Sequence, residues 1–469
     1  MSKPRTNTGW TFAIVSIALF MVVLDNLVVT NALPSIKREL GATIQQLEWT
    51  VNAYTLSYAV LLLTGAALGD RFGRRRTFSL GLGLFTLASA AAAVAPSTSA
   101  LIAARAVQGV GAAVVTPLTL TLLSEAVPKE KRGVAIGAWS GISGLAIALG
   151  PVVGGAVVTG ISWHWIFWLN VPIGAIAAPL AMFRLSESHG ESRGLDFGGL
   201  ALASIGLLGM VYGIVHASSA GWTAFTVLGP IAAGAVFLAA FVAWELRAAE
   251  PMLPMTFFKS RAFSATNGVS IAMYFGTFGS VFLLAQFFQV AQHYSALQSG
   301  LRILPWTVMP IFIAPIAGAL SDRIGGRPLM AAGLALQGAG LAWLAAVTGP
   351  TVAYIHFVPG FVMAGMGMAL VFAPAANTVL GAVRPKQAGQ ASGATNAMRE
   401  LGGVLGVSVL ATVFTGSGGY ASAQNFVDGL VPAVSVGAAV LFIGALVALL
   451  VPGKGPQSAV HSPQEAVAA

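Results

Sequence analysis

The sequence predicts an all-α membrane protein with 14 membrane-spanning helices. Of its 469 residues, 56% are hydrophobic and only 8% are charged, and the mean hydropathy is +0.82. Segments of about 20 apolar residues, each long enough to cross roughly 30 Å of hydrocarbon, follow one another along nearly the whole chain. The connections between them leave no room for a soluble domain, so the chain is expected to lie in a membrane.

The apolar segments have approximate limits that hydropathy alone defines. They fall at 10–33, 49–69, 77–95, 100–123, 133–158, 165–183, 197–217, 222–244, 262–290, 303–321, 328–348, 352–376, 395–417 and 431–451. An even number of spans places both termini on the same side of the membrane.

Basic residues on alternate loops predict which side that is. One set of loops carries Lys3, Arg5, Arg71, Arg74, Arg75, Arg76, Lys129, Lys131, Arg132, Arg184, Arg193, Arg247, Lys259, Arg261, Arg323, Arg327, Arg384, Lys386 and Lys454. The other set has only Lys37, Arg38 and the boundary residue Arg302. By the positive-inside rule, we expect a multi-pass protein of the cell membrane with both termini in the cytoplasm.

A charged loop occurs twice and indicates two related halves. The stretch GAALGDRFGRRR at Gly65–Arg76 is matched by GALSDRIGGRP at Gly318–Pro328. The copies follow the second and tenth spans, whereas two directly joined six-helix halves would place them six spans apart. The predicted division is therefore a six-helix bundle at 1–190, two inserted helices at 191–250, a second six-helix bundle at 251–455, and a disordered cytoplasmic tail at 456–469.

The duplicated loop is expected to act as a cytoplasmic latch that breaks when the two halves rock. An aspartate at the end of a span can bond to neighbouring arginines, and the glycines allow close approach of the backbone. For the arginines alone, a role in setting membrane orientation would suffice. The candidate latch residues are Asp70, Arg71, Gly73, Arg74, Asp322 and Arg323.

Four charged residues fall within the predicted spans, namely Asp25, Arg105, Arg399 and Glu400. A charge in hydrocarbon costs at least about 2.5 kcal/mol unless it is paired or hydrated, so such residues commonly serve transport. Asp25 and Arg105 lie at similar depths, and we expect them to pair across an aqueous cavity in the outer half and to couple protons. The alternative is a permanent salt bridge that fixes helix packing.

The other charged residues in or next to the spans are expected to have structural roles. Arg399 and Glu400 are adjacent, so they point about 100° apart on a helix and favour an interfacial or inter-half ion pair. Glu48 opens the second span beside Trp49, where capping or interfacial anchoring would account for both residues.

The fifth span has a pattern of small residues that predicts close helix packing. Gly150 and Gly154 recur four residues apart, which lets another helix approach closely, and Pro151 removes a backbone donor and bends the segment. We interpret this stretch as a seam that governs gating, although packing without gating remains open.

Polar and aromatic side chains within the spans are candidates for a substrate cavity, although each alone is also compatible with packing or interfacial anchoring. They are Asn26, Thr30, Asn52, Tyr54, Tyr58, Gln108, Trp139, Tyr274, Gln286 and Gln289.

Composition and motifs argue against an enzyme, a sensor or an ATP-driven pump. The chain has no cysteine and no GxxxxGK[ST] element, and only Asp25 and Glu400 supply acids within the spans. A sensor would need a soluble output domain. We therefore expect no metal, no cofactor and no nucleic-acid partner, and the net charge of +9 reflects the basic loops.

Several motifs together resemble the major facilitator superfamily and, within it, the drug:proton antiporters with 14 spans. They are LDNLVVTNALPSI at 24–36, LGDRFGRRR at 68–76, RAVQGVGAA at 105–113, GPVVGG at 150–155 and WHWIFWLNVPIG at 163–174. The chain departs from the family pattern at Ala66, His164 and Gly326, which affects loop details. None of these positions touches the proposed coupling pair.

The resemblance implies a major facilitator fold and export of hydrophobic, often cationic drugs or antibiotics against inward proton flow. By carry-over, Asp25 and Arg105 couple protons, and Gly150, Pro151, Gly154 and Gly155 form the antiporter seam. The expected partners are an amphiphilic small molecule, protons and membrane lipids, with the protein as a monomer driven by the proton gradient. A dedicated exporter of one natural product or lipid is the alternative.

Overall fold

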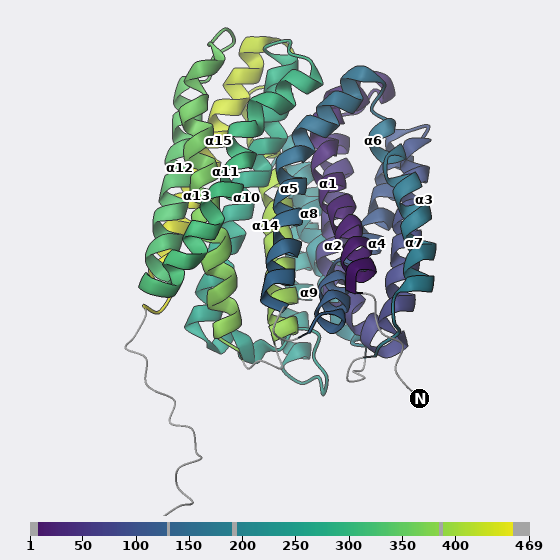
Figure 1. The fold of residues 1–469 in the computed structure, drawn as a ribbon. Coiled ribbons are helices and arrows are strands. Elements are labelled where there is room, and N and C mark those ends of the chain that lie inside the picture. Colours follow the sequence, from purple (N-terminus) through teal and green to yellow (C-terminus); the bar gives the residue numbers. More distant parts are fainter. Residues whose placement is uncertain (1–7, 129–131, 190–194, 384–387, 454–469) are drawn as a thin grey trace, which may run out of the picture.

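The computed structural model describes residues 8–128, 132–189, 195–383 and 388–453, and all regular structure in these ranges is helical (Figure 1). The long helices are α1 (Thr8–Leu40), α2 (Ile44–Phe72), α3 (Arg74–Ala93), α4 (Thr98–Ala126), α5 (Arg132–Gly160), α6 (Trp165–Trp168) with α7 (Asn170–Arg184), α8 (Phe197–Ala220), α9 (Phe225–Glu245), α10 (Arg261–Val290), α11 (Ala296–Ile324), α12 (Gly326–Val347), α13 (Val358–Gly381), α14 (Ala388–Ser417) and α15 (Ala423–Ala448). Short 3₁₀ helices cover Met255–Lys259 and Tyr354–His356. The tail at 456–469 lies outside the described residues.

Each of the 14 predicted spans corresponds to one helix, except that the sixth corresponds to α6 and α7 together. Among the described residues, 12 helical segments are long and apolar enough to cross a membrane. The other two predicted spans are α3, which begins with three arginines, and α5, which contributes the shorter apolar stretch Leu149–Gly160.

Several helices extend beyond the limits that hydropathy predicted, because polar caps add turns outside the apolar stretch. α2 begins five residues early, where the Gln46 amide donates to Thr43 Oγ1 (3.3 Å) and the Thr43 amide donates in return to Gln46 Oε1 (3.0 Å). Ser295 and Gln298 form the same capping box before α11. Such boxes satisfy backbone donors that the helix leaves unpaired.

The two expected bundles lie side by side, with the inserted pair between them on one side (Figure 1). In the first bundle α4 packs on α2 and α3, and in the second α13 packs on α11 and α12. α8 and α9 pack on each other, and α8 also contacts α2 and α14. One such contact is the hydrogen bond from Thr412 Oγ1 to the Ile214 carbonyl (3.1 Å).

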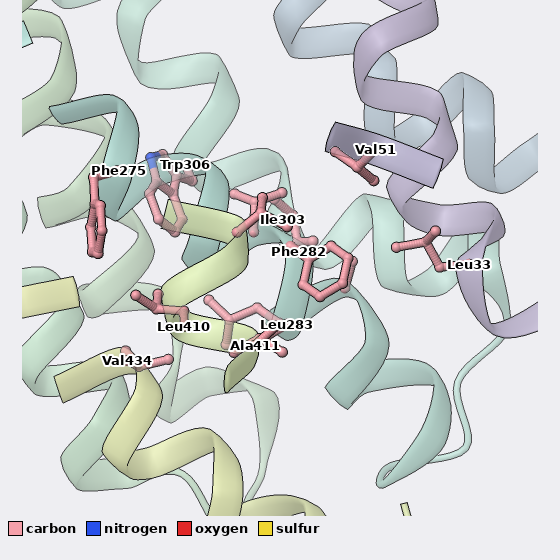
Figure 2. Close-up of a cluster of buried hydrophobic side chains, with 14 of the residues drawn as sticks. Leu33, Val51, Phe275, Phe282, Leu283, Ile303, Trp306, Leu410, Ala411 and Val434 are labelled. Carbon is pink, nitrogen blue, oxygen red and sulfur yellow. The ribbon is translucent and has the colours of Figure 1, made fainter. Parts of the chain in front are cut away.

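The two ends of the molecule differ. We call the end where α2 leads into α3, and α11 into α12, the basic end, because the arginine-rich loop lies there. At the opposite end, helices of the two bundles meet directly: α5 with α11, α2 with α14 and α1 with α10. A continuous apolar cluster fills this contact, with Leu33 and Val51 from the first bundle beside Phe282 and Ile303 from the second (Figure 2).

Hydrogen bonds across the bundles complete the closure of the opposite end. Asn52 Nδ2 donates to Ser408 Oγ (2.8 Å), joining α2 to α14. Gln289 Nε2 donates to the Asn31 carbonyl (3.1 Å), joining α10 to α1. The cross-bundle contact at this end is therefore both apolar and polar.

The bundles approach each other closely through a backbone contact between α5 and α11. A Cβ atom added to Gly155 would overlap the Ala296 carbonyl and lie 2.6 Å from Leu297 Cα. On the other side of the contact, a Cβ at Gly300 would overlap the Pro151 carbonyl. Glycine is thus required on both helices for the opposite end to close.

A large cavity lies between the bundles and extends to the basic end. Its volume is about 2030 Å³, and its wall includes side chains of both bundles. Asp70 and Arg74 at the end of α2 line it, as do Asp196 and Pro251 near the inserted helices. The molecule is therefore closed at one end and accessible at the other, which is one of the two states that alternating access requires.

We predict that Gly155→Val opens the opposite end, because the added side chain cannot fit against α11. The chain has no cysteine, so Leu33→Cys, fully buried in the closure, provides a single reporter. A membrane-impermeant thiol reagent added from the opposite end should label it several-fold faster in the Gly155→Val protein. Gly160→Val is the matched control on the same helix, since its Cβ meets nothing within 4 Å. Equal labelling in both proteins would contradict the role of this contact.

Candidate functional site

The centre of the site is an ion pair between α1 and α4. Arg105 Nη1 lies 2.5 Å from Asp25 Oδ2, and both side chains are fully buried. Gln108 Nε2 donates to Asp25 Oδ1 (2.9 Å), and Asn170 Nδ2 donates to the same oxygen (2.6 Å). The carboxylate therefore receives three hydrogen bonds from three side chains, as a buried charge requires.

The guanidinium of Arg105 is held by backbone and aromatic groups as well. Its Nε donates to the Thr50 carbonyl (3.3 Å), and its charge lies 4.2 Å from the centre of the Tyr54 ring and 5.8 Å from that of Phe167. Its Nη2 has no hydrogen-bond partner among the described residues. An unsatisfied donor on a buried cation is energetically costly. An arrangement of the helices that offers Nη2 an acceptor would therefore be favourable for this arginine.

Asn170 lies in the sixth span where α7 follows α6, and Leu169 between them keeps right-handed helical backbone angles (φ −57°, ψ −34°). Pro172 follows two residues later and cannot donate to the preceding turn. Asn170 Nδ2 also donates to Ser89 Oγ (3.0 Å), whose hydroxyl donates to the Phe167 carbonyl (2.8 Å). The sequence reasoning missed Asn170 and Ser89, although an asparagine next to a proline within an apolar span was an available signal.

The pair does not face an aqueous cavity in this structure, in contrast to the expectation. Neither Asp25 nor Arg105 belongs to the cavity wall. Tyr54 lines the cavity, the Arg105 guanidinium lies 4.2 Å from the centre of its ring, and its hydroxyl donates to the Val22 carbonyl (3.2 Å). Tyr54 therefore belongs to the cavity wall and also contacts the buried ion pair.

Six of the ten predicted cavity residues line the cavity: Asn26, Thr30, Tyr54, Tyr58, Trp139 and Tyr274. The other four, Asn52, Gln108, Gln286 and Gln289, do not. Each of these is held inside the protein by hydrogen bonds between helices or segments, for example Gln286, which accepts a bond from the Tyr420 hydroxyl (2.5 Å). A buried polar group needs such a partner, and in this state the partner is protein.

Arg399 and Glu400 on α14 both line the cavity, so the expected inter-half ion pair is wrong for this state. Arg399 Nη1 donates to Asn396 Oδ1 (3.3 Å), and its guanidinium lies 4.8 Å from the centre of the Phe372 ring. Within the described ranges, no carboxylate forms an ion pair with Arg399, and no group of three His, Asp or Glu side chains is placed to hold a metal.

Glu48 does not cap α2, because Thr43 does. Its side chain is fully buried at the closed opposite end, and neither carboxylate oxygen has a hydrogen-bond partner among the described residues. The interpretation of Glu48 as an exposed interfacial residue is therefore wrong.

The glycine seam of α5 contacts both bundles. A Cβ atom at Gly150 would lie 2.7 Å from Leu27 Cβ, and one at Gly154 would lie 2.9 Å from Val28 Cα, so α5 packs closely on α1. The Pro151 carbonyl accepts a hydrogen bond from Asn31 Nδ2 of α1 (2.5 Å). Since Gly155 contacts α11, the seam connects the helix that carries Asp25 to the contact that closes the opposite end.

The first copy of the duplicated loop is fastened to its own bundle. Arg74 donates to Asp70 Oδ1 through Nη2 (2.7 Å) and Nε (2.9 Å), and it also pairs with Glu125 of α4. Gly73 has a φ of 99°, and a Cβ there would lie 2.8 Å from the Glu187 carboxylate. Arg71 is exposed, with its guanidinium 5.4 Å from the centre of the Phe72 ring.

The second copy of the loop has a similar backbone turn, and the structure describes only some of its side chains. Gly325 joins α11 to α12 with a φ of 85°, as Gly73 joins α2 to α3. Arg323 is exposed in the last turn of α11, and the Asp322 side chain lies outside the described residues. The proposed latch between the two copies therefore stays a prediction.

Comparison with known proteins identifies relatives along most of the chain. The family model for the Major Facilitator Superfamily matches residues 15–407, with a second match over 269–468. The cephamycin export protein CmcT of Amycolatopsis lactamdurans is 36% identical over 427 residues, covering 88% of this chain and 86% of the relative. The tetracenomycin C resistance and export protein of Streptomyces glaucescens is 33% identical over 430 residues, covering 90% and 79%. Multidrug resistance protein Stp of Mycobacterium tuberculosis (strain CDC 1551 / Oshkosh) is 35% identical over 399 residues, covering 85% and 74%.

Solved structures share the fold at low sequence identity. A POT family transporter in complex with a thioalcohol-conjugated peptide superposes with a TM-score of 0.68 at 13% identity, covering 94% of this chain and 95% of that one. The xylose transporter XylE from E. coli gives 0.63 at 13% identity, covering 96% and 99%.

We predict that Gly73→Ala destabilises the protein by about 1–3 kcal/mol, because a side chain is strained at this φ and meets Glu187. Gly83→Ala is the matched control on the adjacent helix, where the added Cβ meets nothing within 4 Å and alanine is the better helix former. The apparent unfolding midpoint of the purified proteins in detergent should fall only for Gly73→Ala. A midpoint equal to that of the control would show that this turn tolerates a side chain.

Proposed function

Because this chain belongs to the Major Facilitator Superfamily, we propose that it is a proton-coupled antiporter that exports hydrophobic, often cationic drugs or antibiotics across the cell membrane by alternating access. The observation that carries the proposal is the fully buried Asp25–Arg105 pair directly behind the wall of a cavity of about 2030 Å³. The names of the relatives, which describe multidrug resistance and antibiotic export, support the substrate class.

The basic end faces the cytoplasm in this proposal, in accord with the positive-inside rule, and both termini lie there. The cavity is then accessible from the cytoplasm and the opposite end is closed to the exterior. A compound in the cytoplasm or the inner leaflet can enter the cavity in this state. Tyr58, Tyr274 and Trp139 provide aromatic surface for it, and Asn26 and Thr30 provide hydrogen-bonding groups.

Proton exchange at Asp25 drives the change of state. The ionised carboxylate is held by Arg105, Gln108 and Asn170. A proton on Asp25 removes the charge that those three donors stabilise and leaves Arg105 without its counter-ion. The α1–α4 contact then loses much of its preference for the present arrangement.

The seam transmits that change. α1 packs on α5 through Gly150 and Gly154, and α5 packs on α11 through Gly155. A shift of α1 therefore alters the contact that holds the opposite end closed. Substrate and proton favour different states of this one equilibrium, which is all that coupling requires.

The duplicated loop closes the basic end in the other state. Asp70 and Arg74 line the open cavity here and are bonded within their own bundle. When the bundles rock, the two copies approach each other and exchange partners across the interface. The proton gradient supplies the energy without a cofactor, and the protein acts as a monomer among lipids.

A second candidate is export of a single natural product. Relatives named for one compound, tetracenomycin C or cephamycin, favour it. The two candidates differ in breadth: a panel of unrelated amphiphiles would all drive proton movement in a multidrug exporter, and one compound would do so in a dedicated exporter.

We predict that Asp25→Asn abolishes proton-coupled export and changes substrate affinity by less than about tenfold, because the amide keeps the shape of the side chain but cannot titrate. Export under an imposed pH gradient and equilibrium binding, both with purified protein, measure the two quantities. Asp428→Asn, a carboxylate on the exposed part of α15, is the control and should keep full export. Full export by the Asp25→Asn protein would exclude Asp25 as the coupling acid.

We predict that Arg105→Lys keeps part of the export activity and that Arg105→Ala has none. Lysine preserves the charge beside Asp25, whereas alanine leaves a buried carboxylate unpaired at a cost of about 3–5 kcal/mol. Export assays and unfolding midpoints, compared among the three proteins, test this order. If all three export equally, this cation has no role in coupling.

A further inference from the structure

We propose that Lys37 and Tyr420 form a lock that holds the opposite end closed, in which the lysine ammonium group of α1 lies on the ring of a tyrosine from the second bundle. Lys37 is thus a positioning residue for the change of state. The inference rests on the proposed function only in that this change of state is a step of export, because the contact itself involves no substrate.

The contact joins the two bundles at the end where they meet. Lys37 lies in the last turn of α1, and Tyr420 lies between α14 and α15. The Nζ atom of Lys37 is 3.1 Å from the centre of the Tyr420 ring. The face of an aromatic ring attracts a cation, and the attraction is stronger where water is partly excluded. Both residues are half-buried, so the contact lies in such a setting.

Basic residues are rare at this end, which makes the position of Lys37 informative. The sequence places three in the loops of this end: Lys37, Arg38 and Arg302. The Arg302 guanidinium lies 3.5 Å from the centre of the Tyr294 ring, within the second bundle. Arg38 Nη2 donates to Ser35 Oγ of its own helix (3.1 Å). Of these three contacts, that of Lys37 is the one that crosses between the bundles.

The charge of Lys37 depends on the ring for its stabilisation in the closed arrangement. Within the described ranges, no carboxylate forms an ion pair with Lys37. When the bundles separate at this end, the ammonium group returns to water and the ring loses its cation. The contact therefore favours one of the two states, as a lock requires.

The ring of Tyr420 is held in place by the second bundle. Its hydroxyl donates to Gln286 Oε1 (2.5 Å), and Gln286 Nε2 donates to the Phe282 carbonyl (2.8 Å). Phe414 and Phe426 meet the ring edge to face, with centres 5.5 and 5.4 Å away. The ammonium group thus lies on a fixed surface that continues into the apolar closure, where Phe282 packs (Figure 2).

α1 connects this lock to the buried ion pair. Asp25 and Lys37 are 12 residues apart on the same helix, which is about 18 Å along its axis. A displacement of α1 that follows a change at Asp25 also moves Lys37 relative to the ring. The lock therefore links α1 directly to the second bundle, in addition to the link that the seam provides through α5.

Thiol labelling tests the lock without a substrate or a pH gradient. The chain has no cysteine, and Ile303→Cys places a reporter in the closure, where Ile303 is 1% exposed (Figure 2). A membrane-impermeant thiol reagent is added from the opposite end to vesicles that contain the full-length protein. Lys37→Met and Tyr420→Leu should each speed labelling by about 2–30-fold, the range expected for loss of a cation–π contact.

Conservative variants separate the lock from general packing. Lys37→Arg keeps the charge and Tyr420→Phe keeps the ring, so each should label within about twofold of the parent protein. Arg38→Met is the matched control. It removes the neighbouring charge, which is hydrogen-bonded to Ser35, and should also label within about twofold of the parent.

A double variant tests whether the two residues act as one unit. The protein with both Lys37→Met and Tyr420→Leu should label no faster than the faster single variant, because both substitutions remove the same contact. Independent effects of the two substitutions would overturn the lock. So would equal labelling of the Lys37→Met and Arg38→Met proteins, or Lys37→Arg or Tyr420→Phe labelling as fast as the corresponding Lys37→Met or Tyr420→Leu protein.

The labelling result is separable from the proposed function. Labelling as predicted, in a protein that moves no protons with any compound, would leave the lock standing and remove the antiport mechanism. Proton-coupled export by a protein in which Lys37→Met changes no labelling rate would leave the antiport mechanism standing and remove the lock.

Discussion

The buried ion pair between Asp25 and Arg105 is the constraint on which the rest of this structure depends. Two charges taken out of water need close partners, and Gln108 and Asn170 provide them. The same requirement fixes α1, α4 and α6–α7 relative to one another. In the proposed mechanism, a proton on Asp25 removes the charge that these donors stabilise and so alters the packing of the first bundle.

The glycines of α5 link the helix that carries Asp25 to the other bundle. Gly150 and Gly154 hold α5 against α1, and Gly155 allows backbone contact with α11 of the other bundle. Close-packed interfaces of this kind have discrete arrangements and deform little, so in the proposed mechanism a small shift of α1 changes which end of the cavity is closed. The transporter fold, the closed opposite end and the cavity open at the basic end are consistent parts of one state.

Much of the fold could be predicted from the sequence, because hydropathy, basic loops and a repeated motif are properties of the chain itself. The direction in which each polar side chain points could not be predicted from the sequence. Asn52 and Gln286 bond within the protein, whereas Tyr58 and Arg399 face the cavity, and all four lie in similar apolar spans. Hydropathy registers depth along a helix but not the direction in which a side chain points. Asn170 was missed for the same reason, since its hydrogen bonds are to Asp25 and Ser89 on distant helices.

The measurement that tests the central claim most directly is substrate-dependent proton movement in vesicles that contain the purified protein under an imposed pH gradient. Lipophilic cations and neutral antibiotics are added in turn, and the internal pH is followed. The account predicts proton movement opposite to that of the compound, with several unrelated amphiphiles. Transport of these compounds without any proton movement, by protein that is folded and correctly inserted, would contradict it.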